Sequence, residues 1–145
     1  MKLLKTLICF LFAFIITSLL VLAMAGMSAN QGAGVNLSLN AVWQYFLLFS
    51  YAMMHKLGLV TIALALFHYF SPSHWPKPIL TLITGFILAL VYNYLLIYYS
   101  SASAMTEHMS LGELFQTYLI YYCIGGMAIG LIGSILSKRL IKPQA

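Results

Sequence analysis

Acidic residues are nearly absent from this sequence. Of its 145 residues, 6% are charged and only 2 are acidic. These are Glu107 and Glu113, and Ser110 with Glu113 has the spacing of a helix capping box, which assigns Glu113 a role at a helix start. Aspartyl peptidases and metal-dependent phosphotransferases need acid pairs or carboxylate ligands inside the site. We therefore predict that the protein is not an enzyme.

Cysteine and histidine are also scarce. The 2 cysteines, Cys9 and Cys123, fall at different depths of their predicted helices, which excludes a disulfide and favours packing roles. Among the 4 histidines only His55 is predicted to lie within the membrane, because His68 and His74 flank the cytoplasmic side and His108 the outer side. A bis-histidine haem needs two imidazoles at one level. His68 and His74 lack a third metal ligand. We predict neither a metal site nor a cofactor.

What the sequence has in abundance is apolar side chain, at 63% of residues. A water-soluble domain of this length has too little interior for so much apolar surface. Four runs are long enough to cross a hydrocarbon layer of about 30 Å. They cover residues 6–27, 42–70, 79–99 and 111–137. We predict an all-α, polytopic integral membrane protein: a single four-helix bundle over residues 1–145.

The basic residues indicate the orientation of this bundle. Segments 28–40 and 100–110 carry no Lys or Arg, whereas basic residues flank the other helix ends, at Lys2, Lys5, Lys77, Lys138, Arg139 and Lys142. The positive-inside rule then places both termini in the cytoplasm. We predict a plasma membrane protein of the bacterial inner-membrane type. The net charge of +5 is explained by this flanking pattern, so we do not predict nucleic acid binding.

The first run is open to a second interpretation. It is also typical of a cleaved signal peptide, which has basic residues (here Lys2 and Lys5), then an apolar stretch, then a cleavage site of small residues (here Ala23-Met24-Ala25). Cleavage would leave three crossings with the later helices oriented as before.

Small residues recur every fourth position in the third and fourth runs. The two stripes are Thr81, Gly85, Ala89 and Asn93, and Tyr122, Gly126, Gly130 and Ser134. Small residues let membrane helices approach closely, because lipid removes most of the hydrophobic drive for association. We predict a tight antiparallel hairpin, with Gly85 opposite Gly130 and Ala89 opposite Gly126. Thr81 is expected opposite Ser134, and Asn93 opposite Tyr122.

Lys56 is a lone cation inside the second run. Such a group costs on the order of 2.5–3.5 kcal/mol even on a lenient insertion scale, so it is expected to face a bundle interior, a wet cavity or a partner. By depth we predict a hydrogen-bonded layer beneath an outward-facing cavity, made of Lys56, His55, Asn93, Tyr92 and Tyr122. The alternatives are that Lys56 extends along a tilted helix towards the membrane surface, or that the first part of the run lies flat on the membrane.

Two functions fit this pattern. The first is a non-enzymatic membrane protein that binds a protein or lipid partner laterally through Lys56 and the tyrosine-rich half, as an accessory subunit, assembly factor or toxin-immunity protein does. The alternative is a small homo-oligomeric transporter or channel in which Lys56 lines an anion-preferring path. The predicted partners are membrane lipids and a membrane protein or further copies of the chain.

Overall fold

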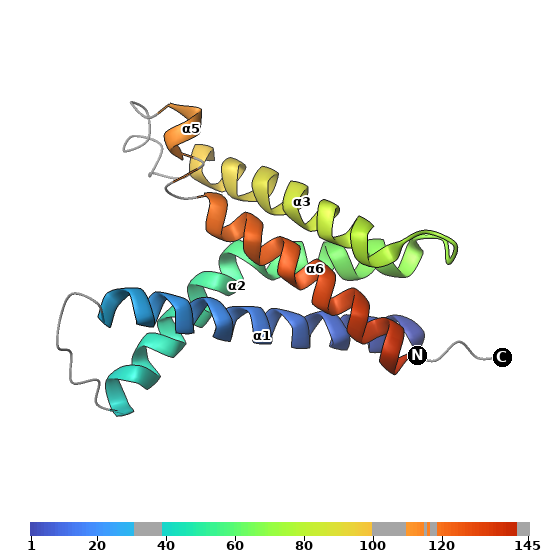
Figure 1. The fold of residues 1–145 in the computed structure, drawn as a ribbon, viewed down its shortest axis with the longest axis horizontal. Helices are drawn as coiled ribbons and strands as arrows, with labels where there is room; N and C mark the ends of the chain where they lie inside the picture. The colour runs from blue at the N-terminus through green and yellow to red at the C-terminus, as the bar shows by residue number, and fades with distance from the viewer. Residues whose placement is uncertain (31–38, 100–109, 115, 117–118, 142–145) are drawn as a thin grey trace.

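The computed structural model describes residues 1–30, 39–99, 110–114, 116 and 119–141 (Figure 1). Its helices are α1 (Lys2–Asn30), α2 (Leu39–Phe70), α3 (Lys77–Tyr99), α5 (Leu111–Leu114) and α6 (Ile120–Leu140). In the described part of the chain, four of them are long and apolar enough to cross a membrane, namely α1, α2, α3 and α6. The predicted all-α class with four such helices is confirmed. The expectations for Glu107 and Lys142 concern residues outside the described ranges.

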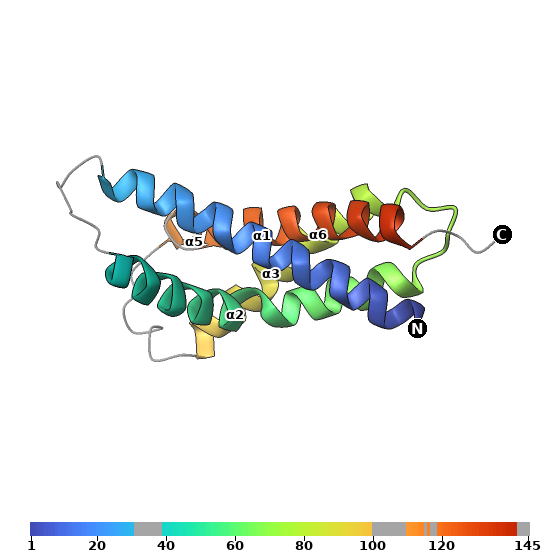
Figure 2. The same cartoon turned by 90° about the horizontal axis from the view of Figure 1, so that it is seen from below.

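The four long helices run back and forth along one axis. The start of α1, the α2–α3 connection and the end of α6 lie together at one end of the molecule, here called the proximal end (Figures 1 and 2). At the opposite, distal end, α1 and the first half of α2 diverge from α3 and α6, and α2 changes direction near its middle (Figure 1). The described lysines and arginines other than Lys56 therefore gather at the proximal end.

The fourth predicted run, residues 111–137, contains the short α5 and most of the long α6. Between these two helices, the described residues Gln116 and Leu119 have π-helical backbone. Hydropathy counts apolar residues along the chain and does not detect such a change in backbone winding. The long helix α6 covers Ile120–Leu140.

The predicted capping box is confirmed at the start of α5. The Ser110 amide and hydroxyl both donate to Glu113 Oε2, at 2.9 and 3.0 Å, and the Glu113 amide donates to Ser110 Oγ at 3.3 Å. The first two bonds stabilise the carboxylate and hold the pKa of Glu113 below its usual value. The described acid is thus engaged at a helix start.

The bundle is apolar outside and partly polar inside. Large apolar side chains such as Phe12, Ile62 and Ile124 are at least half exposed. The interior holds an apolar cluster that includes Phe10 and Leu57, but also buried polar side chains, among them Asn93. A water-soluble protein does not cover itself with contiguous apolar surface in this way, whereas lipid accepts it.

The most extensive helix packing is between α3 and α6. The buried side of α3 consists of Thr81, Gly85, Ala89 and Asn93. A Cβ added at Gly85 would overlap the Gly126 carbonyl, and one added at Gly130 would overlap the Thr81 carbonyl. The two backbones therefore touch at these positions, which only glycine permits. The Thr81 hydroxyl also donates to the Gly130 carbonyl at 2.9 Å.

The register of this hairpin differs in part from the predicted one. Ala89 contacts the Gly126 position, as expected, since a Cβ on Gly126 would lie 2.7 Å from Ala89 Cβ. The atoms nearest to a Cβ added at Gly85, however, belong to Gly126, and those nearest to one added at Gly130 belong to Thr81, so these closest contacts are one turn away from the predicted pairs. The reason is that Gly126 lies between Gly85 and Ala89. Residues of one helix fit into the spaces between residues of the other helix, so they do not pair one to one at equal depth.

Two further glycines let α6 pack against the other helices. A Cβ on Gly125 would lie 2.8 Å from Leu57 Cδ1 of α2, and one on Gly133 would lie 2.6 Å from Phe10 Cδ1 of α1. Helix α6 thus receives a neighbour on three sides, and each neighbour meets a glycine. The period-four stripe identified only the side that faces α3.

A test of this packing compares two glycine-to-alanine changes. Gly126→Ala forces a methyl group against α3 backbone and is expected to lower the free energy of unfolding by about 1–3 kcal/mol, as overpacking does. Gly58→Ala is the matched control, because its Cβ would meet only Met54 Cγ at 3.6 Å. Alanine there should leave stability unchanged or raise it by up to about 1 kcal/mol through helix propensity. Unfolding of both variants in mixed detergent micelles, followed by circular dichroism, measures the difference; equal stabilities would contradict the backbone contact.

Candidate functional site

Lys56 of α2 lies against an aromatic ring of α6. Its ammonium nitrogen is 5.8 Å from the centroid of the Tyr122 ring, within the range of cation–π attraction. The Lys56 side chain is half-buried, and so is Tyr122. The ring offers the cation partial compensation for lost water, but it supplies no negative charge.

Two side chains of α3 bind the α2 backbone at the same level. The fully buried Asn93 amide donates to the Lys56 carbonyl at 3.2 Å and to the Ala89 carbonyl at 2.9 Å. The Tyr92 hydroxyl donates to the His55 carbonyl at 3.2 Å. These bonds attach α2 to α3 beside the base of the lysine side chain, so the starting point of that side chain is held in place. We call Lys56, Tyr122, Asn93 and Tyr92 the Lys56 site.

The Lys56 site differs from the predicted layer in how its members interact. His55 contributes its backbone carbonyl, while its side chain is exposed. Asn93 is directed towards the Lys56 carbonyl rather than the ammonium. Counting residues along each helix predicts which residues lie at the same level. The rotation of a helix about its axis determines which side chains face inward, and the rotation of α2 directs the His55 imidazole outward. The cavity predicted above this layer stays a prediction.

No described carboxylate balances the Lys56 charge. Glu113 is the one acid in the described ranges, and it binds Ser110 at the start of α5. The buried Asn93 Oδ1 also has no hydrogen-bond partner among the described atoms. The site therefore combines a half-buried lysine that lacks a described counter-charge with an unpaired amide oxygen. The ammonium would gain from an added anionic acceptor, and the amide oxygen from an added donor.

Sequence inspection missed a second polar cluster, at the proximal end. There a pocket brings together residues from α1, α2, the α2–α3 connection and α6, including Lys2, Lys77, Lys138 and Ser134. The charge pattern placed these lysines at one membrane face. Ser134 was predicted only as a packing residue, because nothing in a period-four stripe distinguishes a contact from a pocket wall.

The remaining candidates for chemistry are dispersed. Cys9 and Cys123 are free and buried on α1 and α6. Within the described residues, no group of three or more His, Cys, Asp or Glu comes together.

Comparisons of the chain with protein-family models, curated proteins and solved structures give no match. The class of protein follows from the fold alone: four long apolar helices with an apolar exterior are those of an integral membrane protein.

A double-mutant cycle tests the contact between Lys56 and Tyr122. Lys56→Met and Tyr122→Leu should be less destabilising together than the sum of the single changes, with a coupling of about 0.5–2 kcal/mol. The control cycle pairs Lys56→Met with Tyr121→Leu, because Tyr121 precedes Tyr122 but is 63% exposed. Its coupling should be near zero. Both cycles are measured by unfolding in detergent. Equal coupling energies for the Lys56/Tyr122 and Lys56/Tyr121 cycles would show that the Tyr122 ring does not interact specifically with the cation.

Proposed function

We propose that this protein is a non-enzymatic membrane protein that binds another membrane protein laterally, and that Lys56 is the contact for a carboxylate on a transmembrane helix of the partner. The observation that carries the proposal is the half-buried Lys56 ammonium, held against Tyr122 with no described carboxylate beside it. A partner carboxylate would supply the missing charge, and Coulomb attraction is strong where water is scarce.

The depth of Lys56 favours a protein carboxylate over a lipid phosphate. Lys56 lies within α2, which has 32 residues, and it falls inside the apolar span Ser50–Phe70 of that helix, so its place is in the apolar part of the helix and not at either helix end. Lipid phosphates occupy the membrane surfaces, whereas a transmembrane helix can carry an acid to any depth. An acid of that kind is itself costly in lipid, which gives both partners a reason to associate.

The surface next to Lys56 on α2 is available to a partner. Tyr51 and Met54 are 75% and 68% exposed, and His55 is also exposed. These side chains combine apolar area with polar groups, which suits a contact inside or near the membrane better than contact with lipid alone. The partner helix would lie along this face and direct its acid towards Lys56.

We further propose that the proximal end faces the cytoplasm of a bacterial cell, with the protein in the plasma membrane. The support is the gathering of Lys2, Lys5, Lys77, Lys138 and Arg139 at that end. A green fluorescent protein fused after residue 145 should then fluoresce, and alkaline phosphatase at the same position should be inactive. The control fusion follows residue 99, at the distal end, where the two reporters should give the opposite result. Active phosphatase after residue 145 would refute this orientation.

The partner proposal is tested by photo-crosslinking in native membranes. A photoreactive amino acid replacing the exposed His55 should give an adduct whose partner peptide, identified by mass spectrometry, contains an acid within an apolar stretch. Lys56→Arg should retain the adduct, while Lys56→Met should reduce its yield by at least about tenfold, because removal of one partner leaves a buried charge unpaired. Lys5→Met is the control for loss of a lysine elsewhere.

Two results would count against the proposal. An adduct yield unaffected by Lys56→Met would show that the cation is not the contact. A symmetric homo-oligomer in native mass spectrometry, together with anion flux that depends on Lys56, would instead establish a channel.

A further inference from the structure

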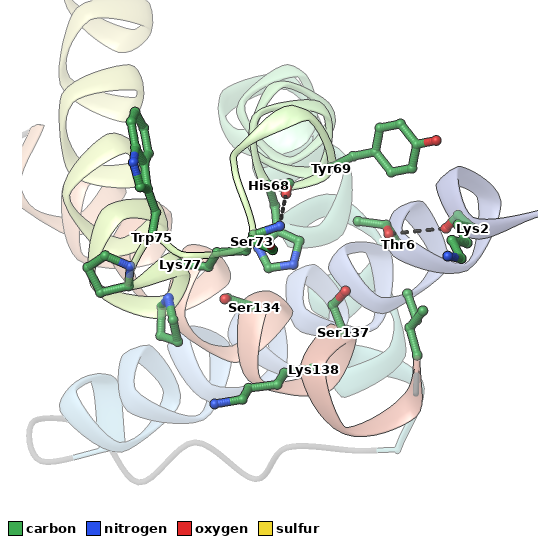
Figure 3. Close-up of a pocket in the computed structure, with 13 residues that line it drawn as sticks. Lys2, Thr6, His68, Tyr69, Ser73, Trp75, Lys77, Ser134, Ser137 and Lys138 are labelled. Atoms are coloured by element: carbon green, nitrogen blue, oxygen red, sulfur yellow. Dashed lines mark hydrogen bonds between the residues drawn. The ribbon is translucent and has the colours of Figure 1, made fainter. Parts of the chain in front are cut away.

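A pocket of about 570 Å³ opens at the proximal end (Figure 3). Lysines from three elements line it: Lys2 at the start of α1, Lys77 at the start of α3 and Lys138 in the last turn of α6. None of the residues that line it is acidic. The pocket is therefore a concave basic site, and it is separate from the Lys56 site.

The floor of the pocket contains polar atoms without partners. Ser134 of α6 is fully buried, and its hydroxyl has no hydrogen-bond partner among the described atoms. Nδ1 of His68, on α2, is also buried and unpaired in the described part. Figure 3 shows His68 of α2 and Ser134 of α6 among the residues that line the pocket. A buried polar atom left without a partner is unfavourable, so the Ser134 hydroxyl would gain from a ligand that accepts its hydrogen bond.

The positions of these groups are constrained by their own contacts. The His68 ring packs on Phe10, with ring centroids 5.5 Å apart. The Lys77 ammonium donates to the His68 carbonyl at 3.2 Å, and an ammonium has two further protons to donate. The Lys77 ammonium and the His68 ring are thus held in place before any ligand enters.

Backbone amides at the start of α3 do not contribute to this site. The Lys77 amide donates to the Trp75 carbonyl at 2.7 Å, and the Ile79 and Leu80 amides both donate to the Pro76 carbonyl at 3.1 Å. Pro78 has no amide proton. An anion in the pocket would therefore depend on side chains, which mutation can remove one at a time.

We propose that this pocket binds the phosphate of an anionic phospholipid headgroup. The phosphate would accept hydrogen bonds from Lys77 and Ser134, with the ammonium groups of Lys2 and Lys138 at the rim. The position favours a lipid over a soluble anion, because the pocket lies at one end of four membrane-spanning helices and Trp75, an interfacial residue type, lines it. This proposal does not depend on a partner at Lys56.

A simpler role for the lysines makes a different prediction. Lys77 caps a carbonyl in the last turn of α2, and Lys138 lies in the last turn of α6, where cations offset the helix dipole. That role does not involve the unpaired Ser134 hydroxyl at the pocket floor. The contribution of Ser134 therefore distinguishes a lipid site from helix capping.

Native mass spectrometry of the full chain in detergent, titrated with phosphatidylglycerol or with phosphatidylcholine, measures the binding. The wild type should bind one phosphatidylglycerol in preference to phosphatidylcholine. Lys77→Gln, which keeps a hydrogen-bond donor, and the pair Lys2→Gln/Lys138→Gln should each weaken that binding about tenfold, as loss of a charged hydrogen bond does. The matched control is Lys5→Gln/Arg139→Gln, with the same loss of charge from exposed residues outside the pocket. It should change the affinity by less than about twofold.

Ser134→Ala provides the variant that removes no charge. It should weaken phosphatidylglycerol binding about fivefold, while its unfolding midpoint in detergent stays equal to that of the wild type or rises, because an unpaired buried hydroxyl is lost. Unchanged lipid affinity in this variant would overturn the proposal, as would equal weakening by the Lys5/Arg139 control. Displacement of the lipid by inorganic phosphate at comparable concentration would also overturn it, since the site would then be one for a soluble anion.

Discussion

The contact between the backbones of α3 and α6 is the constraint on which the rest of the structure depends. Where Gly85 meets Gly126 and Thr81 meets Gly130, carbonyl groups lie against positions that have no Cβ. In lipid, where the hydrophobic effect contributes little to helix association, such close approach and the Thr81–Gly130 hydrogen bond stabilise the pair. With α3 fixed on α6, Asn93 is placed where its amide reaches the α2 backbone.

Helix α6 serves as a shared wall for the bundle because its glycines face three neighbours. Gly125 accommodates Leu57, and Gly133 accommodates Phe10. The same helix supplies Tyr122 to the Lys56 site and Ser134 to the proximal pocket. The two candidate sites are therefore held at different levels of one element, and the small residues that bring its neighbours close also bring the polar groups of those neighbours together.

Both candidate sites contain lysines that no described carboxylate balances. At Lys56 the ammonium has an aromatic face but no described carboxylate, and at the proximal pocket lysines surround an unpaired hydroxyl. Glu113, the acid in the described part, is already engaged by Ser110. In the described ranges no other carboxylate is left to balance these groups, which is the physical basis for proposing external anionic partners at each site.

Hydropathy and charge in the sequence were sufficient for the helical class, the four long apolar helices and the grouping of basic residues. The stripes at Gly85 and Gly126 predicted which sides of α3 and α6 meet, and the Ser110–Glu113 spacing predicted the helix cap. These properties belong to single residues or to one turn of helix, because they reflect transfer from water and local hydrogen bonding. Only the tertiary structure decided the Gly85–Gly126 register, the outward rotation of His55, and the meeting of Ser134 with Lys77 around one pocket. Those outcomes depend on how far helices rotate and how closely their backbones approach, and several distant segments determine this together.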